Sequence, residues 1–169
     1  MSEVYKRKGI TLIEILVMLA VIVVLTLLSI PLFSSLIQHY RITSATEQLY
    51  STLQYARTEA IKRNTSVYVS VSTGDSWCYG VNTGSTCTCS TAGSCNLGSV
   101  TAASSGVLTL SATGLSSNSF YFDNTHGGAS GSVTLTYTLY GQSSLITMSV
   151  SRLGSISTCS TGITGYTAC

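Results

Sequence analysis

Charged side chains are scarce in this sequence of 169 residues. They make up 8% of it, whereas a typical soluble domain has roughly 25%. Beyond Asn64 only Asp75, Asp123 and Arg152 carry charge, so residues 64–169 have a net charge of −1. Proteins that bind nucleic acid neutralise phosphates with Lys and Arg, so this composition argues against a nucleic-acid partner. The abundant Ser, Thr, Gly and Asn suit a protein packed among other subunits or displayed outside the cell.

The sequence also lacks the short motifs of common enzymes, such as a P-loop, GxGxxG or HExxH. Asp123, His126 and one of the many serines could be imagined as a catalytic triad, but a polar turn after a strand is the simpler interpretation. The acidic residues are too few for the oxygen-rich cage of a calcium site. We therefore expect a protein that is not an enzyme and has neither a cofactor nor a metal site.

Cysteine is present six times, always in the C-terminal two-thirds. The even count favours disulfides and an oxidising compartment. Zinc is the alternative, but the usual ligand spacings are missing. A bridge between the last two cysteines would hold down the C-terminal tail, and the other four would staple the loop of residues 78–95. The candidate disulfide residues are Cys78, Cys87, Cys89, Cys95, Cys159 and Cys169.

A long apolar run lies near the N-terminus. From Ile15 to Ile37 there are 23 residues without charge, enough to cross the roughly 30 Å hydrocarbon core of a bilayer as a helix. Three basic residues precede the run, which predicts a cytoplasmic N-terminus by the positive-inside rule. A cleaved secretory signal fits less well, because its apolar region would be shorter.

Helical periodicity continues past the apolar run. Apolar residues recur at spacings of three and four, the period of an amphipathic helix, until Asn64 and Thr65 end the pattern. One helix is therefore predicted from about residue 10 to residue 63, with a kink near Pro31, which lacks a backbone N–H. The apolar positions are Ile42, Ala45, Leu49, Leu53, Ala56 and Ala60.

The rest of the chain shows the period-two alternation of β-strands. The fold class predicted is α+β: a long N-terminal helix packed on an antiparallel β-sheet or sandwich. Trp77 is expected to be a core residue, and Gly141 with Gln142 to form a hairpin turn. Residues 82–106 are expected to be a surface loop without other structure, held by cysteines. The strands are predicted at 67–72, 107–110, 119–123, 133–140, 145–152 and 155–158.

One carboxylate, Glu14, stands at the start of the apolar run. An ionised Glu in a membrane helix costs a few kcal/mol unless it is paired or near the interface. A simple anchor has no need of it, so Glu14 is a functional candidate whose partner must be a cation. The apolar run contains no cation, but a free amine would arise if the chain were cut after Gly9.

The segment KGITLIEILVMLAVIVVL resembles the class III signal of type IV prepilins and type II secretion pseudopilins. The matching residues are Gly9, Ile10, Thr11, Leu12 and Glu14, with Ile10 in place of the commoner Phe. The resemblance implies cleavage between Gly9 and Ile10 by a prepilin peptidase, then N-methylation of Ile10. It also implies assembly roles for Thr11 and Glu14, with Glu14 pairing with the Ile10 amine of a neighbouring subunit.

The remaining chain resembles the GspH/FimT-like subfamily of minor pilins and pseudopilins. The similar segments are the helix-to-strand junction at 56–71, the W-x-x-G element of Trp77 and Gly80, the strand end at 120–127, and the stretch 151–159. Pro31 also falls where pilin helices often carry a proline.

One departure from this subfamily concerns DNA. Members active in DNA uptake carry a glycine-arginine-x-arginine motif near the C-terminus. The corresponding stretch here is Gly154-Ser155-Ile156-Ser157, without either arginine, so we expect no appreciable binding of duplex DNA.

The resemblance implies a leader at 1–9, a transmembrane and assembly helix at 10–37, and a globular domain at 38–169. This domain comprises an amphipathic helix (38–63) and a β domain (64–169). The function implied is that of a minor type IV pilin; the alternatives are a GspH-type pseudopilin of type II secretion and an adhesive tip module. The expected partners are other pilin subunits, prepilin peptidase and the bacterial inner membrane. The chain would sit in that membrane before assembly, and in a periplasm-facing or extracellular pilus afterwards.

Overall fold

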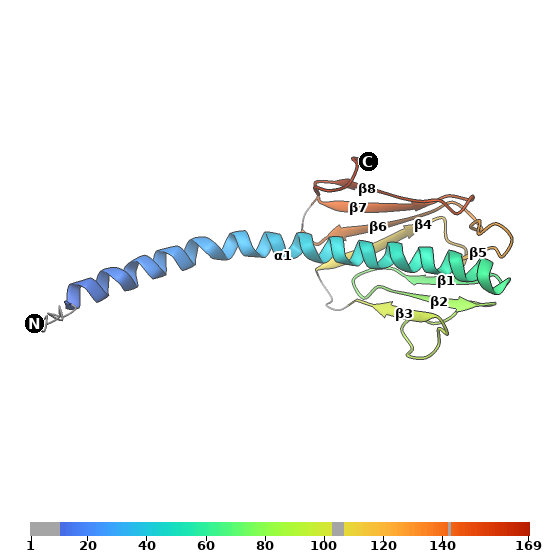
Figure 1. Ribbon diagram of the computed structural model, residues 1–169, viewed down its shortest axis with the longest axis horizontal. Helices are drawn as coiled ribbons and strands as arrows, with labels where there is room; N and C mark the ends of the chain where they lie inside the picture. Colours follow the sequence, from blue (N-terminus) through green and yellow to red (C-terminus); the bar gives the residue numbers. More distant parts are fainter. Residues whose placement is uncertain (1–10, 103–106, 142) are drawn as a thin grey trace, which may run out of the picture. The chain divides into compact units, whose positions relative to one another are not determined.

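The computed structural model describes residues 11–102, 107–141 and 143–169, without the side chains of 27–35. Contacts divide the chain into two units, Met1–Ile37 and Gln38–Cys169. One helix, α1 (Leu12–Arg63), contributes to both units (Figure 1). The predicted helix therefore exists and ends where expected, whereas the kink near Pro31 stays a prediction.

The second unit contains two four-stranded antiparallel sheets. The first has the order β3-β2-β1-β5 and the second β4-β6-β7-β8. This arrangement confirms the α+β class with an antiparallel β domain. The strands are β1 (Val67–Ser72), β2 (Cys78–Thr83), β3 (Gly98–Thr101), β4 (Leu108–Thr113), β5 (Ser119–Phe122), β6 (Val133–Leu139), β7 (Leu145–Val150) and β8 (Ile156–Thr161).

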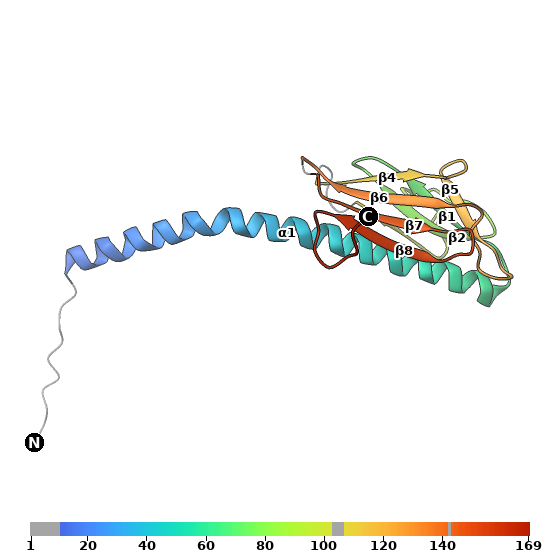
Figure 2. The same ribbon diagram turned by 90° about the horizontal axis from the view of Figure 1, so that it is seen from above.

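The main hydrophobic core of the described residues joins the C-terminal part of α1 to both sheets. In Figures 1 and 2 this part of the helix lies along the sheets, with β1–β3 and β6–β8 on either side of it in Figure 1. Five of the six apolar helix positions predicted from the sequence are buried, and Ala45 is partly buried against the same core. The fully buried helix residues are Ile42, Leu49, Leu53, Ala56 and Ala60.

Trp77 anchors this core between the sheets, as expected. Its ring stacks on Tyr79 at 6.0 Å and meets Tyr137 edge-on at 5.1 Å. Its Nε1 donates to the Leu108 carbonyl at 3.1 Å, which satisfies the buried indole N–H and links the first sheet to β4. Beside this link, Gly74 of the β1–β2 turn pairs with Leu110 through both backbone hydrogen bonds.

Two strands, β2 and β3, are absent from the sequence prediction, and residues 82–106 are therefore not a structureless loop. In β2 the side chains on both faces are buried through its first four residues, so no alternation of polar and apolar residues marks it. Tyr79 and Val81 belong to the core. Cys78 forms one of the disulfides described below, and Gly80 lies directly beneath them. Strand β3 is only four residues long and mostly exposed, so it gives hardly any periodic signal.

The junction between α1 and β1 is a helix cap built around Asn64. The Thr65 amide donates to the Ala60 carbonyl and the Asn64 amide to the Ile61 carbonyl, the two hydrogen bonds of a Schellman motif. Asn64 takes the left-handed conformation that this cap requires, with φ of 50°. The Asn124 amide group donates to the Asn64 side-chain oxygen at 2.9 Å and thereby ties the cap to the segment after β5.

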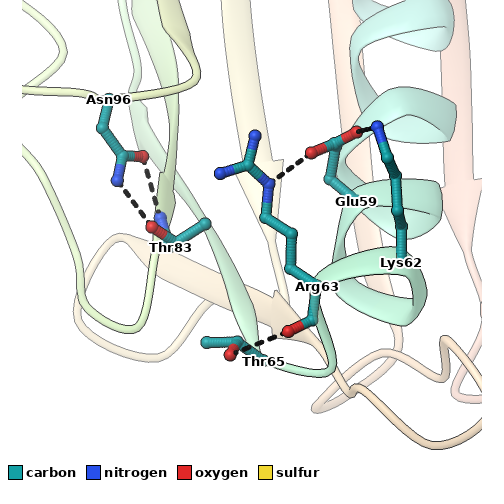
Figure 3. A network of polar contacts seen from close by, with 6 residues as sticks. All are labelled: Glu59, Lys62, Arg63, Thr65, Thr83 and Asn96. Atoms are coloured by element: carbon teal, nitrogen blue, oxygen red, sulfur yellow. Dashed lines mark hydrogen bonds and ion pairs between the residues drawn. The ribbon is translucent and has the colours of Figure 1, made fainter.

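The last turn of α1 holds both ion pairs found among the described residues (Figure 3). The Glu59 carboxylate accepts hydrogen bonds from the Arg63 Nε and, at 3.2 Å, from the Lys62 Nζ. The Arg63 bond, with a smaller effect from Lys62, lowers the pKa of Glu59 against the opposing effect of burial. Two cations at a helix C-terminus also complement the helix dipole.

Two disulfides cover the outer face of the first sheet. Cys78 is joined to Cys89 and Cys87 to Cys95. They lie against Gly80, where an added Cβ would come within 2.3 Å of the Cys95 sulfur. The Cys87 amide also donates to the buried Ser70 hydroxyl at 3.1 Å. The glycine of the W-x-x-G element therefore makes room for the disulfide-bonded loop.

Replacing Gly80 by Ala should destabilise this loop, because the new methyl group would overlap the Cys95 sulfur. We expect a lower melting temperature and partial labelling of Cys87 and Cys95 by a thiol reagent under non-reducing conditions. Gly131→Ala is the matched control, since a Cβ there meets only one atom, at 3.9 Å. Equal melting temperatures and no labelling in both variants would contradict this account of Gly80.

Candidate functional site

The first candidate site is the start of α1. Gly9 and Ile10, the proposed cleavage residues, lie outside the described part of the chain. Thr11 precedes the helix, and its carbonyl accepts hydrogen bonds from the amides of Glu14 and Ile15 at 3.1 and 3.3 Å. Thr11 therefore flanks the helix start, and Glu14 lies in the first helical turn, where a carboxylate is favoured by the helix dipole.

The apolar residues around Glu14 are exposed throughout the described start of α1. Every large apolar side chain from Leu12 to Leu25 is 45–79% accessible. Glu14 is the only charged residue of 12–37, and neither ion pair of the described residues involves it. Monomeric soluble proteins rarely expose so extensive an apolar surface, and such surfaces mark interaction sites. Among the described residues, no helix is long and apolar enough to count as a candidate membrane span.

The cysteines form three disulfides, and none of the six is free. Cys159 and Cys169 are joined, so the bridge suggested by the sequence is present in the structure. It fastens the C-terminal tail along β8, where the Ser160 amide donates to the Thr167 carbonyl and the Cys169 amide to the Ser160 carbonyl. The other two bridges overlap in sequence within 78–95.

Asp123 organises the loop after β5 rather than a catalytic group. Its Oδ1 accepts from the amides of Thr125, His126 and Gly127, and its Oδ2 from the amide of Gly128, all within 2.8–3.2 Å. These hydrogen bonds lower the pKa of the Asp123 carboxyl, and the bond from the His126 amide has the largest effect. The interpretation of Asp123 and His126 as a polar turn is therefore confirmed.

The same loop joins α1 to the β7–β8 turn. The Gly127 carbonyl accepts a hydrogen bond from Arg57 Nε at 3.1 Å. Gly154 lies so close that a Cβ there would be 2.0 Å from that carbonyl oxygen. Sequence reasoning missed the roles of Arg57 and Gly154, because nothing in the spacing of residues so far apart indicates this contact. The only sign of this contact in the sequence is that Gly127 and Gly154 match glycines of the subfamily pattern.

Two shallow hollows lie between α1 and the region of β3. One of about 360 Å³ is lined by Ser51, Thr52 and Tyr55 of α1, by Tyr79, and by residues 97–100. Another of about 310 Å³ is lined by α1 residues from Tyr40 to Gln48, by Trp77, and by residues of 100–101 and 107–108. In the described chain no group of three or more His, Cys, Asp or Glu residues is arranged to hold a metal ion.

The family model of the type II transport protein GspH matches residues 45–154. The chain belongs to the GspH family. It is thus a subunit of the minor pilin and pseudopilin type, a group of structural, assembling proteins associated with pili and membranes. The family match begins after the apolar run, so it does not include the residues of the class III signal.

Two crystal structures of the type IV minor pilin FimU from Pseudomonas aeruginosa PAO1, in different space groups, resemble this GspH-family chain. Both share 21% sequence identity with it and cover 69% of it, with TM-scores of 0.54 and 0.52. The alignments cover 87% and 91% of the FimU chains. At this identity the likeness concerns the fold, which is therefore that of a minor pilin. No curated protein matches the chain.

Replacing Asp123 by Asn should weaken the loop of 123–128, because the amide group offers an N–H where Gly128 needs an acceptor. The pKa of Asp123 is lowered in the folded state, so its stabilising contribution is present above the ordinary carboxyl pKa of about 4 and is lost as the pH falls further. The melting temperature of Asp123→Asn should lie below that of the wild type at pH 7, and the difference should shrink below pH 4.

The exposed turn residue Asp75 provides the control, as Asp75→Asn. This variant should melt with the wild type at both pH values. A pH-independent gap for Asp123→Asn would show that the carboxylate charge does not stabilise the loop.

Proposed function

We propose that this chain is a minor type IV pilin, a non-catalytic subunit that initiates, caps or decorates a pilus. The observation that supports this most is the exposed apolar surface of 12–25 with Glu14 as its only charge, on a chain that carries a GspH-family domain. Such a surface requires a lipid or protein environment, and both are available to a subunit that passes from a membrane into a filament.

Processing would create the partner of Glu14. Cleavage between Gly9 and Ile10 by prepilin peptidase releases the basic leader and leaves a new amine, which is then N-methylated. In a bundle of apolar helices an unpaired carboxylate is costly. The Ile10 amine of a neighbouring subunit would neutralise it and would set the axial register between the two helices, because only one offset brings the charges together.

Before assembly, residues 10–37 would anchor the subunit in the bacterial inner membrane, with the N-terminus in the cytoplasm. The three basic residues before Gly9 support this orientation. The disulfide-bonded domain would then lie on the oxidising, periplasmic side and would reach the extracellular pilus on assembly.

A GspH-type pseudopilin of a type II secretion system is the second candidate, favoured by the description of the matching family. Both candidates need the same N-terminal chemistry and the same compartment. Mature protein that co-purifies with sheared pili supports the pilin assignment, whereas presence only in cell envelopes with secretion-system subunits supports the pseudopilin.

Replacing Gly9 by Trp should leave the leader attached, because a bulky side chain obstructs the close approach of a protease to the backbone. Immunoblots should show only the longer precursor, nine residues heavier than the mature form. Lys8→Ala, which alters the leader beside the same bond, should still be cut. Normal processing of Gly9→Trp would contradict cleavage at this site.

Replacing Glu14 by Ala should permit cleavage but reduce incorporation into filaments, since the Ile10 amine of the neighbour would lose its counter-charge. The measurement is the ratio of mature protein in sheared filaments to that in cells. Asp75→Ala removes an exposed carboxylate outside α1 and should incorporate normally. Undiminished incorporation of Glu14→Ala would argue against the pairing.

A further inference from the structure

Three of the four sheet edges are covered within the described residues. The edge of β5 pairs with the segment around Ala129, since Ser130 donates to the Tyr121 carbonyl. The edge of β4 pairs with Gly74, and that of β8 with the C-terminal tail held by the last disulfide. The remaining edge is that of β3.

The backbone of β3 directs unpaired groups outward. The Ala102 amide donates to the Trp77 carbonyl, opposite it in the β2–β3 register. Hydrogen-bonding direction alternates along an antiparallel strand, so the N–H and C=O groups of Ser99 and Thr101 face away from β2. Both residues are exposed, and no hydrogen bond among the described residues engages these four groups.

Edges that are not meant to pair usually carry a lysine, a proline or an inward charge. The β3 sequence, GSVT, has none of these. The other three edges are closed by segments of the chain itself, whereas β3 is protected only by its short length, which makes it the edge of the described residues where a strand can be added.

A cleft beside this edge contains an unsatisfied polar group. It is the hollow of about 360 Å³ between α1 and residues 97–100. Tyr79 lines it and is 1% exposed; its hydroxyl lies near that of Thr52 but makes no hydrogen bond of good geometry with any described residue. The neighbouring Thr52 hydroxyl donates to the Gln48 carbonyl at 2.8 Å. A buried hydroxyl without a partner is unfavourable by about 1–3 kcal/mol.

We propose that β3 accepts an extended, uncharged strand from a neighbouring subunit of the filament. This strand bonds to the backbone of Ser99 and Thr101 and places an acceptor in the cleft for the Tyr79 hydroxyl. The inference rests on the proposed function, because it takes the neighbour to be another filament subunit.

The charge distribution favours a strand over a charged partner. No residue that lines the cleft is charged, and residues 64–169 carry only three charged side chains. A contact made at this cleft therefore cannot rely on ion pairs from the residues that line it. Backbone pairing along a free edge supplies both affinity and direction without charge.

The test compares Ser99→Pro with Ser99→Ala. Proline removes an outward N–H and leaves the β2–β3 ladder intact, and alanine keeps that N–H. Both variants should be processed and should melt close to the wild type. Filament-associated Ser99→Pro should fall about tenfold, the effect of one lost backbone bond, whereas Ser99→Ala should match the wild type.

Hydrogen exchange gives a second readout on the wild type. Amides of Ser99 and Thr101 should exchange about tenfold more slowly in sheared filaments than in the mature chain in detergent. The Ser160 amide, already bonded to Thr167, should exchange equally in both. Normal incorporation of Ser99→Pro, or unchanged exchange at β3, overturns the inference. Absence of the wild-type chain from filaments contradicts the proposed function instead.

Discussion

Burial of one face of α1 is the contact on which the folded domain depends. Each four-stranded sheet has an apolar inner face, and the helix residues from Ile42 to Ala60 pack against both. Trp77 and Gly74 fasten the sheets to each other near β4. The Asp123 loop fastens α1 to the β7–β8 turn. The helix completes the core that the two sheets share, so it is structural here as well as a candidate for assembly.

Scarcity of charge explains how the loops are held. With both ion pairs of the described residues at Glu59, the β domain relies on backbone amides, hydroxyl groups and disulfides instead. Asp123 shows the principle most clearly, because one carboxylate satisfies four amides of its own loop. Such contacts are local and need no partner of opposite sign elsewhere in the chain.

The sequence predicted the parts of the fold that have a clear period. The helix face of 42–60 and strands β1, β6 and β7 bury their apolar face more completely than the opposite face, so their patterns could be recognised. Strand β2 could not, because the disulfide loop buries its second face, and β3 is too short and too polar. The disulfide between Cys159 and Cys169 could be predicted because the two residues are close in the sequence. The contact between Arg57, Gly127 and Gly154 joins three distant segments and has no local signal.

The overlap of the two disulfides on the first sheet has a consequence for the order of folding. A chain whose cysteines were oxidised in the order in which they are synthesised would join Cys78 to Cys87, yet the structure joins Cys78 to Cys89 and Cys87 to Cys95. In the folded protein these partners lie against Gly80 of β2, and the Cys87 amide is held by the Ser70 hydroxyl of β1. Pairing of β1 with β2 therefore favours the native bonds over the bond between Cys78 and Cys87.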